Sequence, residues 1–295
     1  MSEEYTEFNC DLCGSSDAEP IEVSRKYLSN NEVIHVCKDC GFVYVRNRRS
    51  IDRIAEAWSK EIYQKGYTAR IPAVVARQTY VAEFIDSSIG LKGKSVCDIG
   101  GGEGQFLDII RGDQYGAEVF GIEPSEQNCK LMSDAGIDNF EGTIEDYIAS
   151  GTDKKFDIVT VMWTLENTQD CRGMIGAAHD LLKDGGHLLI ATGSRIMVPF
   201  KKPLHLYISK NPADTHCFRV SANTLQGLMA VSGFKMAHVN RYIDTDYLTM
   251  IGQKSDKSQS IDWQGDDWSK VVDFFNRWDK ETSEHYPTEV NPATA

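Results

Sequence analysis

Short runs rich in β-branched and aromatic residues alternate with helical patterns from Lys94 onward. Such alternation indicates parallel strands joined by helices that cover both faces of one sheet. A long connection separates the fifth predicted strand from a helix that starts near Ser221. The predicted strands lie near residues 95–99, 117–122, 138–140, 156–161, 186–192, 234–240 and 246–252. The pattern therefore predicts an α/β fold with three layers, one sheet between two layers of helices.

Residues 50–90 show a helical pattern of their own, on either side of an aromatic turn at residues 61–68. Beyond the sheet, residues 254–265 are polar, and an amphipathic helix is predicted from Trp268 to Trp278. The chain is thus expected to have four parts. These are an N-terminal module at 1–49, a helical connector at 50–90, a sheet domain at 91–253, and a polar linker with a C-terminal helix and tail at 254–295.

Composition and charge narrow the class of protein. The chain has 295 residues, of which 41% are hydrophobic and 25% charged, so it has enough apolar surface to bury a core. A formal net charge of −13 repels a phosphate backbone, which disfavours nucleic acid as a partner. No apolar run approaches the ~20 residues of a membrane helix, and the acidic start of the chain is unlike a signal peptide. We therefore expect a cytoplasmic protein.

Four of the eight cysteines form two C-x-x-C pairs, Cys10 with Cys13 and Cys37 with Cys40. Both thiolates of such a turn can face one metal ion, and two pairs complete the tetrahedron that zinc prefers. A redox pair would occur once beside a βαβ pattern, and a reducing compartment disfavours disulfides. The sequence therefore predicts one structural zinc in a small ribbon. The remaining four cysteines are expected to be buried hydrophobic side chains.

A glycine-rich turn follows the first predicted strand, in the run Asp98-Ile99-Gly100-Gly101-Gly102-Glu103-Gly104. Glycines let a ligand approach the backbone closely, and the following helix starts with unpaired N–H groups. The second strand ends in Glu123, roughly 20 residues beyond the last glycine, as expected for a carboxylate that binds both ribose hydroxyls. A nicotinamide dinucleotide site would need glycine at position 105, whereas the observed spacing suits S-adenosylmethionine.

With three further segments, this turn resembles the class I S-adenosylmethionine-dependent methyltransferases. The segments are Gly121-Ile122-Glu123-Pro124-Ser125, Phe156-Asp157-Ile158-Val159 and Leu182-Lys183-Asp184-Gly185-Gly186-His187-Leu188. The resemblance covers about 91–252 and implies a Rossmann-like seven-stranded sheet whose last strand is antiparallel. It places Gly100, Gly102 and Gly104 beside the methionine part of the cofactor, and Glu123 on the ribose.

Further candidate cofactor contacts are Asp98, Pro124, Thr143, Ile144 and Tyr67. Thr143 stands where the family often has an acid that binds the adenine amino group. Asn167 stands where related enzymes often have a histidine, so no role transfers from that histidine. Tyr63 and Tyr67 in the aromatic turn either close over cofactor and substrate or pack between helices.

A four-cysteine module, an aromatic helical connector and a methyltransferase core together resemble the zinc-containing sugar methyltransferases that act on nucleotide-linked sugars. Some of these enzymes C-methylate a keto-sugar and carry a long C-terminal domain, whereas only some forty residues follow the last predicted strand here. The resemblance therefore favours O-methylation of a hydroxyl of a nucleotide-linked sugar or glycan precursor. C-methylation of a keto-sugar nucleotide is the alternative.

A hydroxyl acceptor needs in-line positioning and a base that takes its proton. The base is expected near the carboxyl ends of the strands, on the long connection after the fifth strand. His216 on this connection corresponds to a histidine before a helix start in the sugar enzymes and is the first candidate. His205 is the second candidate. The competing interpretation of either residue is a capping or surface histidine.

Two rival classes stay open on the sequence alone. A ribosomal RNA methyltransferase would grip RNA with its zinc module, but residues 1–50 contain nine acids and one basic patch, Arg46-Asn47-Arg48-Arg49. An assembly protein would bind the cofactor without transferring its methyl group.

Overall fold

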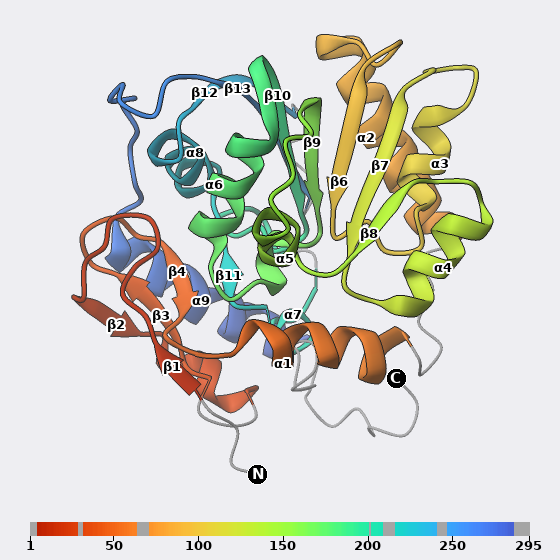
Figure 1. The fold of residues 1–295 in the computed structure, drawn as a ribbon. Coiled ribbons are helices and arrows are strands. Elements are labelled where there is room, and N and C mark those ends of the chain that lie inside the picture. Colours follow the sequence, from red (N-terminus) through yellow and green to blue (C-terminus); the bar gives the residue numbers. More distant parts are fainter. Residues whose placement is uncertain are drawn as a thin grey trace.

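The computed structural model describes residues 5–28, 32–63, 71–200, 202–208, 216–240 and 247–285. One seven-stranded sheet stands at the centre, with a small β-module beside it (Figure 1). The strand order is β12-β13-β10-β9-β6-β7-β8, and β13 runs antiparallel to both of its neighbours. The strands are β6 (Ser95–Ile99), β7 (Glu118–Glu123), β8 (Asn139–Glu141), β9 (Phe156–Met162), β10 (Leu182–Thr192), β12 (Phe234–Val239) and β13 (Leu248–Lys254). The predicted sheet with an antiparallel last strand is confirmed.

Two layers of helices cover the sheet because strand side chains point alternately to its two faces. Val96 and Leu189 pack on one face with α2, α3 and α4, whereas Cys97 and Leu188 pack on the other with α5, α6 and α8. The helices are α2 (Pro72–Ile89), α3 (Gln105–Arg111), α4 (Glu126–Asp134), α5 (Ile144–Ala149), α6 (Cys171–Leu181) and α8 (Ala222–Val231). The predicted three-layer arrangement is therefore confirmed.

The start of β10 differs from the sequence prediction. The strand begins at Leu182 instead of 186, and its pairing with β9 is irregular until His187. The intervening Lys183, Asp184 and Gly185 are exposed, so the stretch lacks the apolar run that marks a buried strand. The fifth strand was thus predicted too short.

The N-terminal module consists of five short strands and a 3-10 helix. These are β1 (Tyr5–Glu7), β2 (Ala18–Pro20), η1 (Glu22–Lys26), β3 (Ile34–Cys37), β4 (Val43–Val45) and β5 (Asn47–Arg49). β1 pairs with β5, and the other strands form a sheet of order β11-β4-β3-β2. Its outer strand β11 (Phe218–Arg219) comes from a distant part of the sequence, and Phe218 pairs with Tyr44 of β4. This strand, which begins two residues after His216, therefore completes the sheet of the module.

Arg48 lies at the junction of the module and the sheet domain, with 0% of its side chain exposed. Its guanidinium donates two hydrogen bonds to the Asp11 carboxylate, of 2.9 and 2.5 Å, and one of 2.6 Å to the backbone oxygen of Gln169. The guanidinium carbon also lies 4.4 Å from the ring centroid of Phe218 and 4.6 Å from that of Phe8. This buried charge is therefore fully paired and stacked.

The predicted helical connector begins at Ser50, whose hydroxyl caps α1 (Ile51–Glu56). The π-helix η2 (Ala57–Tyr63) continues α1, and both pass along one edge of the sheet domain (Figure 1). Tyr67, in the predicted aromatic turn, lies outside the described residues, as does the side chain of Tyr63.

The C-terminal helix α9 (Trp268–Ser283) is five residues longer than predicted and packs beside α7 (Leu204–Tyr207). Trp278 donates a 2.7 Å hydrogen bond to the backbone oxygen of Lys202, and its ring centroid lies 4.6 Å from that of Tyr207. Between β9 and α6 lies the short helix η3 (Leu165–Asn167). Within the described ranges, every helix is too short or too polar to cross a membrane.

Replacing Arg48 by methionine is expected to lower the free energy of unfolding by about 3–5 kcal/mol, because it leaves the Asp11 carboxylate buried and uncompensated. The same replacement at Arg25, an exposed residue paired with Glu22 in the same module, should cost no more than about 0.5 kcal/mol. Urea unfolding of the two variants and the wild type measures the difference. Equal losses in the two variants would show that the Arg48 pair does not hold the junction.

Candidate functional site

A cavity of about 620 Å³ opens at the carboxyl ends of the central strands, a size suited to a cofactor with a small acceptor. Most of the residues singled out in the sequence line it. They are Asp98, Gly100, Gly102, Glu123, Pro124, Thr143, Ile144 and His216. Gly104 and His205 are absent from the lining of the cavity as described. The structure therefore brings the glycine turn, the acid after the second strand and one candidate base into one space.

The glycine turn is shaped by left-handed backbone conformations. Gly100 has φ of 74°, and a Cβ built on it would stand 2.4 Å from the Thr164 hydroxyl oxygen. Gly104 has φ of 75° and lies behind the cavity, where a Cβ would stand 2.5 Å from Cγ of Met132. Gly100 thus permits the close approach of Thr164, whereas Gly104 permits close packing of α3 on α4.

Glu123 ends β7 with only 4% of its surface exposed. Its carboxylate accepts hydrogen bonds from the backbone N–H groups of Gly102 (2.9 Å) and Ser125 (3.0 Å). Burial raises the pKa of Glu123, while these backbone hydrogen bonds lower it. The two loops that follow β6 and β7 therefore hold this carboxylate at the wall of the cavity.

Asp98 lies beside Glu123 and is 2% exposed. Burial, together with the charge of Glu123, raises the pKa of Asp98 to about 7, against a hydrogen bond of 2.6 Å from the Thr160 hydroxyl that lowers it. Two carboxyl groups thus meet at this wall of the cavity, and neither forms an ion pair with a described residue. Such a site favours a ligand with positive charge.

Thr143 has a role that the sequence did not predict. Its hydroxyl and backbone N–H both bond to the Asp146 carboxylate, which makes it the N-cap of α5 within a capping box. The residue lines the cavity while it fixes the start of the helix. The adjacent Ile144 presents an apolar side chain, 2% exposed, to the same space.

His216 lines the cavity from the long connection after β10. Its Nδ1 lies 2.7 Å from the hydroxyl oxygen of Ser194, just beyond the end of β10. The next residue, Cys217, donates its N–H to the backbone oxygen of Glu166 and accepts from the N–H of Val45 in the ribbon. Three separate parts of the chain therefore fix the position of His216.

His205 lies elsewhere, on α7. Its ring centroid is 6.0 Å from that of Tyr27 in the N-terminal module. The two candidate bases thus occupy different surroundings, and only His216 shares the cavity with the glycine turn.

Glu166, directly before Asn167, is a site residue that the sequence did not predict. It is 3% exposed, lines the cavity, and has one carboxylate oxygen without a hydrogen-bond partner among the described residues. Burial raises the pKa of Glu166, and the charge of His216 lowers it. A buried carboxylate therefore faces the candidate base, and the Leu-Glu-Asn segment was the available signal for it.

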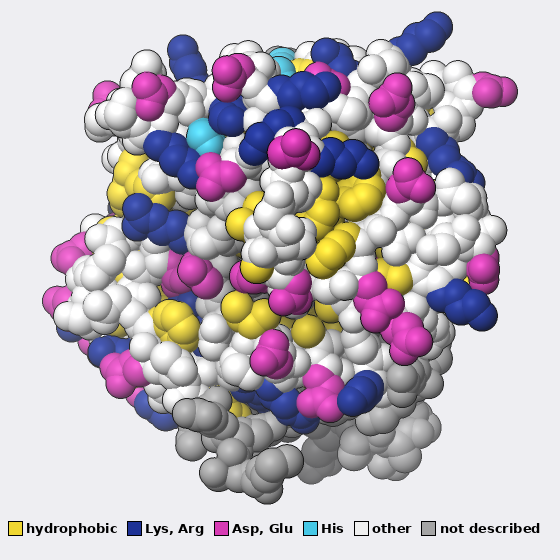
Figure 2. Space-filling model, in the orientation of Figure 1, with side chains coloured by type: hydrophobic (Ala, Val, Ile, Leu, Met, Phe, Trp, Pro, Cys, Tyr) yellow, Lys and Arg dark blue, Asp and Glu magenta, His cyan; other side chains and the backbone are white. Residues whose placement is uncertain are grey.

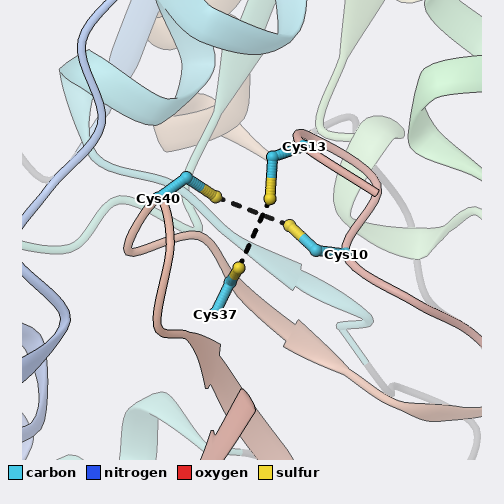
Figure 3. A group of neighbouring side chains, drawn as sticks. All are labelled: Cys10, Cys13, Cys37 and Cys40. Atoms are coloured by element: carbon cyan, nitrogen blue, oxygen red, sulfur yellow. Dashed lines mark hydrogen bonds between the residues drawn. The ribbon is translucent and has the colours of Figure 1, made fainter. Parts of the chain in front are cut away.

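The sulfur atoms of Cys10, Cys13, Cys37 and Cys40 all lie within 4.8 Å of one another and point to a common centre (Figure 3). The Cys10–Cys40 and Cys13–Cys37 sulfur separations are 3.5 and 3.4 Å. A tetrahedral zinc with bonds of about 2.3 Å would place its sulfur ligands roughly 3.8 Å apart. The donor set therefore fits one four-coordinate soft metal ion after a small adjustment. The other four cysteines are buried, as predicted.

The arginines of the basic patch form ion pairs with acidic residues of the same N-terminal module. Arg46 pairs with Glu7, Arg48 with Asp11, and Arg49 with Glu32, and the side chains of Arg48 and Arg49 are at most 4% exposed. Acidic and basic side chains are also interspersed on the face shown in Figure 2. These arginines therefore do not offer a continuous basic surface for RNA.

The sheet order, the glycine turn and the acid after the second strand define the class I S-adenosylmethionine-dependent methyltransferase architecture. A sequence model described as "Methyltransferase domain" matches residues 74–239, which include both strands and the turn. The chain belongs to this methyltransferase-domain family.

Curated relatives are similar in sequence to part of the chain. The ubiquinone biosynthesis O-methyltransferase of Pseudomonas paraeruginosa is 34% identical over 118 residues, which cover 38% of this chain and 50% of that protein. The protein of the same name from Thiobacillus denitrificans is 33% identical with the same coverage. The chain thus spans about half the length of the curated relatives it matches.

Solved structures agree with the fold. Magnesium protoporphyrin IX methyltransferase from Synechocystis, with S-adenosylhomocysteine bound, has a TM-score of 0.52 and 15% identity, covering 70% of this chain and 100% of that one. The 1,6-didemethyltoxoflavin-N1-methyltransferase of Burkholderia thailandensis, with its acceptor and S-adenosylhomocysteine, has a TM-score of 0.52 and 14% identity, covering 82% and 100%. At these identities the likeness concerns the fold.

Proposed function

We propose that the protein transfers a methyl group from S-adenosylmethionine to a hydroxyl of a small molecule, in the first place a sugar of a nucleotide-linked substrate or glycan precursor. The observation that carries the proposal is the position of His216 in the same cavity as the glycine turn and Glu123. The O-methyltransferase names of the curated relatives favour oxygen as the acceptor atom. C-methylation of a keto-sugar nucleotide is the second candidate, because it too needs a base at this position.

In this proposal the cofactor lies along the acidic end of the cavity. Gly100 and Gly102 leave room for its methionine part, and the Glu123 carboxylate accepts hydrogen bonds from the ribose hydroxyls. Pro124, Thr143 and Ile144 border the adenine. When bound, S-adenosylmethionine supplies an electrophilic methyl group on a positively charged sulfur. The raised pKa values of Asp98 and Glu123 support this placement, since a cation relieves the buried carboxyl groups.

In the proposed reaction His216 takes the proton of the acceptor hydroxyl at Nε2. For this, Nδ1 must carry the hydrogen and donate it to the Ser194 oxygen, 2.7 Å away. The Glu166 carboxylate then stabilises the imidazolium that forms. The cavity would hold the acceptor hydroxyl beside His216 and the bound cofactor's methyl group, so that transfer of the methyl from sulfur to oxygen would accompany loss of the hydroxyl proton to His216.

We further propose that the four clustered cysteines bind one structural zinc ion. Four thiolates close the coordination shell, so the metal stabilises the ribbon and leaves no position for a reacting group. None of the eight cysteines, all of them described, forms a disulfide, which is consistent with a reducing compartment, and we propose the cytoplasm.

The Glu123→Ala variant is expected to bind S-adenosylhomocysteine at least about 100-fold more weakly, because hydrogen bonds to a charged group contribute roughly 1.5–3 kcal/mol each. Glu126→Ala, three residues further on and exposed, is the matched control and should bind like the wild type. Isothermal titration calorimetry measures both, with thermal unfolding to confirm that each variant folds. Unchanged affinity in a folded Glu123→Ala protein would contradict the proposed ribose contact.

The His216→Ala variant is expected to transfer methyl groups about 10²- to 10⁴-fold more slowly, with S-adenosylmethionine affinity nearly unchanged. Wild-type activity should fall at acid pH, because a protonated imidazole cannot accept the hydroxyl proton. Methyl transfer to a panel of nucleotide-linked sugars and phenols, followed with labelled cofactor, provides the rates. His205→Ala is the control. A normal rate and a normal acid limb in His216→Ala would eliminate His216, and a loss in His205→Ala would transfer the role to that residue.

Metal analysis is expected to find about one zinc per chain. Cys37→Ser should lose the metal and unfold the ribbon, because a missing thiolate opens the shell. Cys129→Ser, which changes a buried thiol outside the cluster, should keep it. Limited proteolysis of the two variants reports the folding of residues 5–49. Metal-free wild-type protein with a fully protected ribbon would refute the zinc proposal.

A further inference from the structure

The chain between β13 and α9 passes over the N-terminal ribbon. In Figure 1 it runs from the sheet to the ribbon before it enters α9. Polar residues dominate the stretch 254–265, but the side chains of Trp263 and Trp268 are partly buried. The segment 263–268 therefore packs against neighbouring parts of the chain.

This segment lies on the turn Cys37–Cys40, the second knuckle of the ribbon. The N–H of Asp266 donates a 3.0 Å hydrogen bond to the backbone oxygen of Cys40. Gly265 lies so close to the same carbonyl group that a Cβ at this position would collide with it, and glycine permits the approach. The ammonium group of Lys38, inside the knuckle, lies 5.5 Å from the ring centroid of Trp268. The segment thus closes over the second knuckle.

The same segment is attached to α8 of the sheet domain at two places. The Asn223 side chain, in the first turn of α8, donates a 2.8 Å hydrogen bond to Oδ1 of Asp266. One turn further along the helix, a Cβ built on Gly227 would lie 2.8 Å from Cε3 of Trp263. The indole ring therefore lies directly on the backbone of α8.

The first knuckle of the ribbon, Cys10–Cys13, rests on the same place. A Cβ on Gly227 would also lie 3.1 Å from Cδ1 of Leu12, which stands inside this knuckle. Trp263 packs against the hydrophobic cluster that contains Leu12 and three of the four clustered cysteines. α8 is thus a common support, which the first knuckle contacts directly and the second through the segment 263–268.

Such a support bears on the metal because the proposed zinc ion takes two sulfur ligands from each knuckle. Any separation of the two knuckles would open its coordination shell. Cys10, Cys37 and Cys40 are at most 3% exposed, and only Cys13 of the four is exposed. Contacts outside the ligand shell that fix the ligands commonly change metal affinity 10- to 100-fold. Contacts that hold the knuckles together should therefore slow the loss of the metal.

We propose that residues 263–268 form a clasp, which fastens the second knuckle to α8 and slows the release of the metal ion from the ribbon. This inference rests on the proposed zinc site. The hydrogen bond from Asp266 to Cys40 fixes the backbone of a ligand, and Trp263 and Asn223 anchor the clasp to the sheet domain. Metal retention at the N-terminus is thus controlled by a segment close to the C-terminus.

The test measures zinc release from full-length, zinc-loaded protein to an excess of the coloured chelator 4-(2-pyridylazo)resorcinol. Gly227→Ala adds a methyl group that pushes Trp263 and Leu12 away from α8, while alanine favours the helix itself. Gly265→Ala places a Cβ against the Cys40 carbonyl. Both variants are expected to release zinc about 10-fold faster or more. Gly176→Ala in α6 is the matched control, since nothing lies within 4 Å of its Cβ, and its rate should be unchanged.

Thermal unfolding confirms that each variant folds, and hydrogen exchange of residues 35–45 provides a second measurement. Exchange in this region should be faster in Gly227→Ala than in Gly176→Ala. Wild-type release rates in both folded clasp variants would overturn the inference, as would equally fast release in Gly176→Ala. If the wild type takes up no zinc, the zinc proposal fails, and hydrogen exchange then decides whether the clasp holds the knuckle. Equal exchange in Gly227→Ala and Gly176→Ala would show that it does not.

Discussion

The pairing of β4 with β11 is the contact on which the arrangement of this molecule depends. It adds two residues from a distant part of the sequence, Phe218 and Arg219, to the sheet whose β3–β4 hairpin carries Cys37 and Cys40. His216 stands two residues before this strand, and Ser194 and Glu166 hold the same short segment from the sheet domain. Backbone hydrogen bonds of Cys217 therefore connect the ribbon to the segment that carries the candidate base.

The buried carboxyl groups that line the cavity link the stability of the fold to ligand binding. Burial raises the pKa of Asp98 from 3.8 to about 7, so the folded chain holds a proton there that the unfolded chain has released. Folding therefore becomes less favourable as the pH rises from about 4 to about 7 through this group. A positively charged ligand beside these carboxyl groups would offset that cost.

Sequence patterns predicted those features that short segments encode by themselves. The strands, the glycine turn, Glu123 and the C-x-x-C pairs each lie within a few consecutive residues, and the structure places them as expected. The contacts of residues 263–268 with the second knuckle could not be predicted, because they join segments that are distant in sequence. His216 ranked above His205 only through a resemblance, because both lie on one long connection, and the tertiary fold shows how their surroundings differ.

In the proposed enzyme, the ribbon serves the reaction by holding His216 in place, although four thiolates would leave no open position on its metal. Ordering the backbone of one residue costs roughly 1–2 kcal/mol, so a base on a long connection is held in place only if other contacts offset that cost. The segment around His216 receives them from Val45 of the ribbon, from the backbone oxygen of Glu166, and from Ser194 beyond β10. The ribbon in turn is too small to bury a large core, and the proposed zinc ion would supply the stability that its strands lack. In the proposed enzyme, the free energy of metal binding is therefore used to orient His216, the candidate proton acceptor.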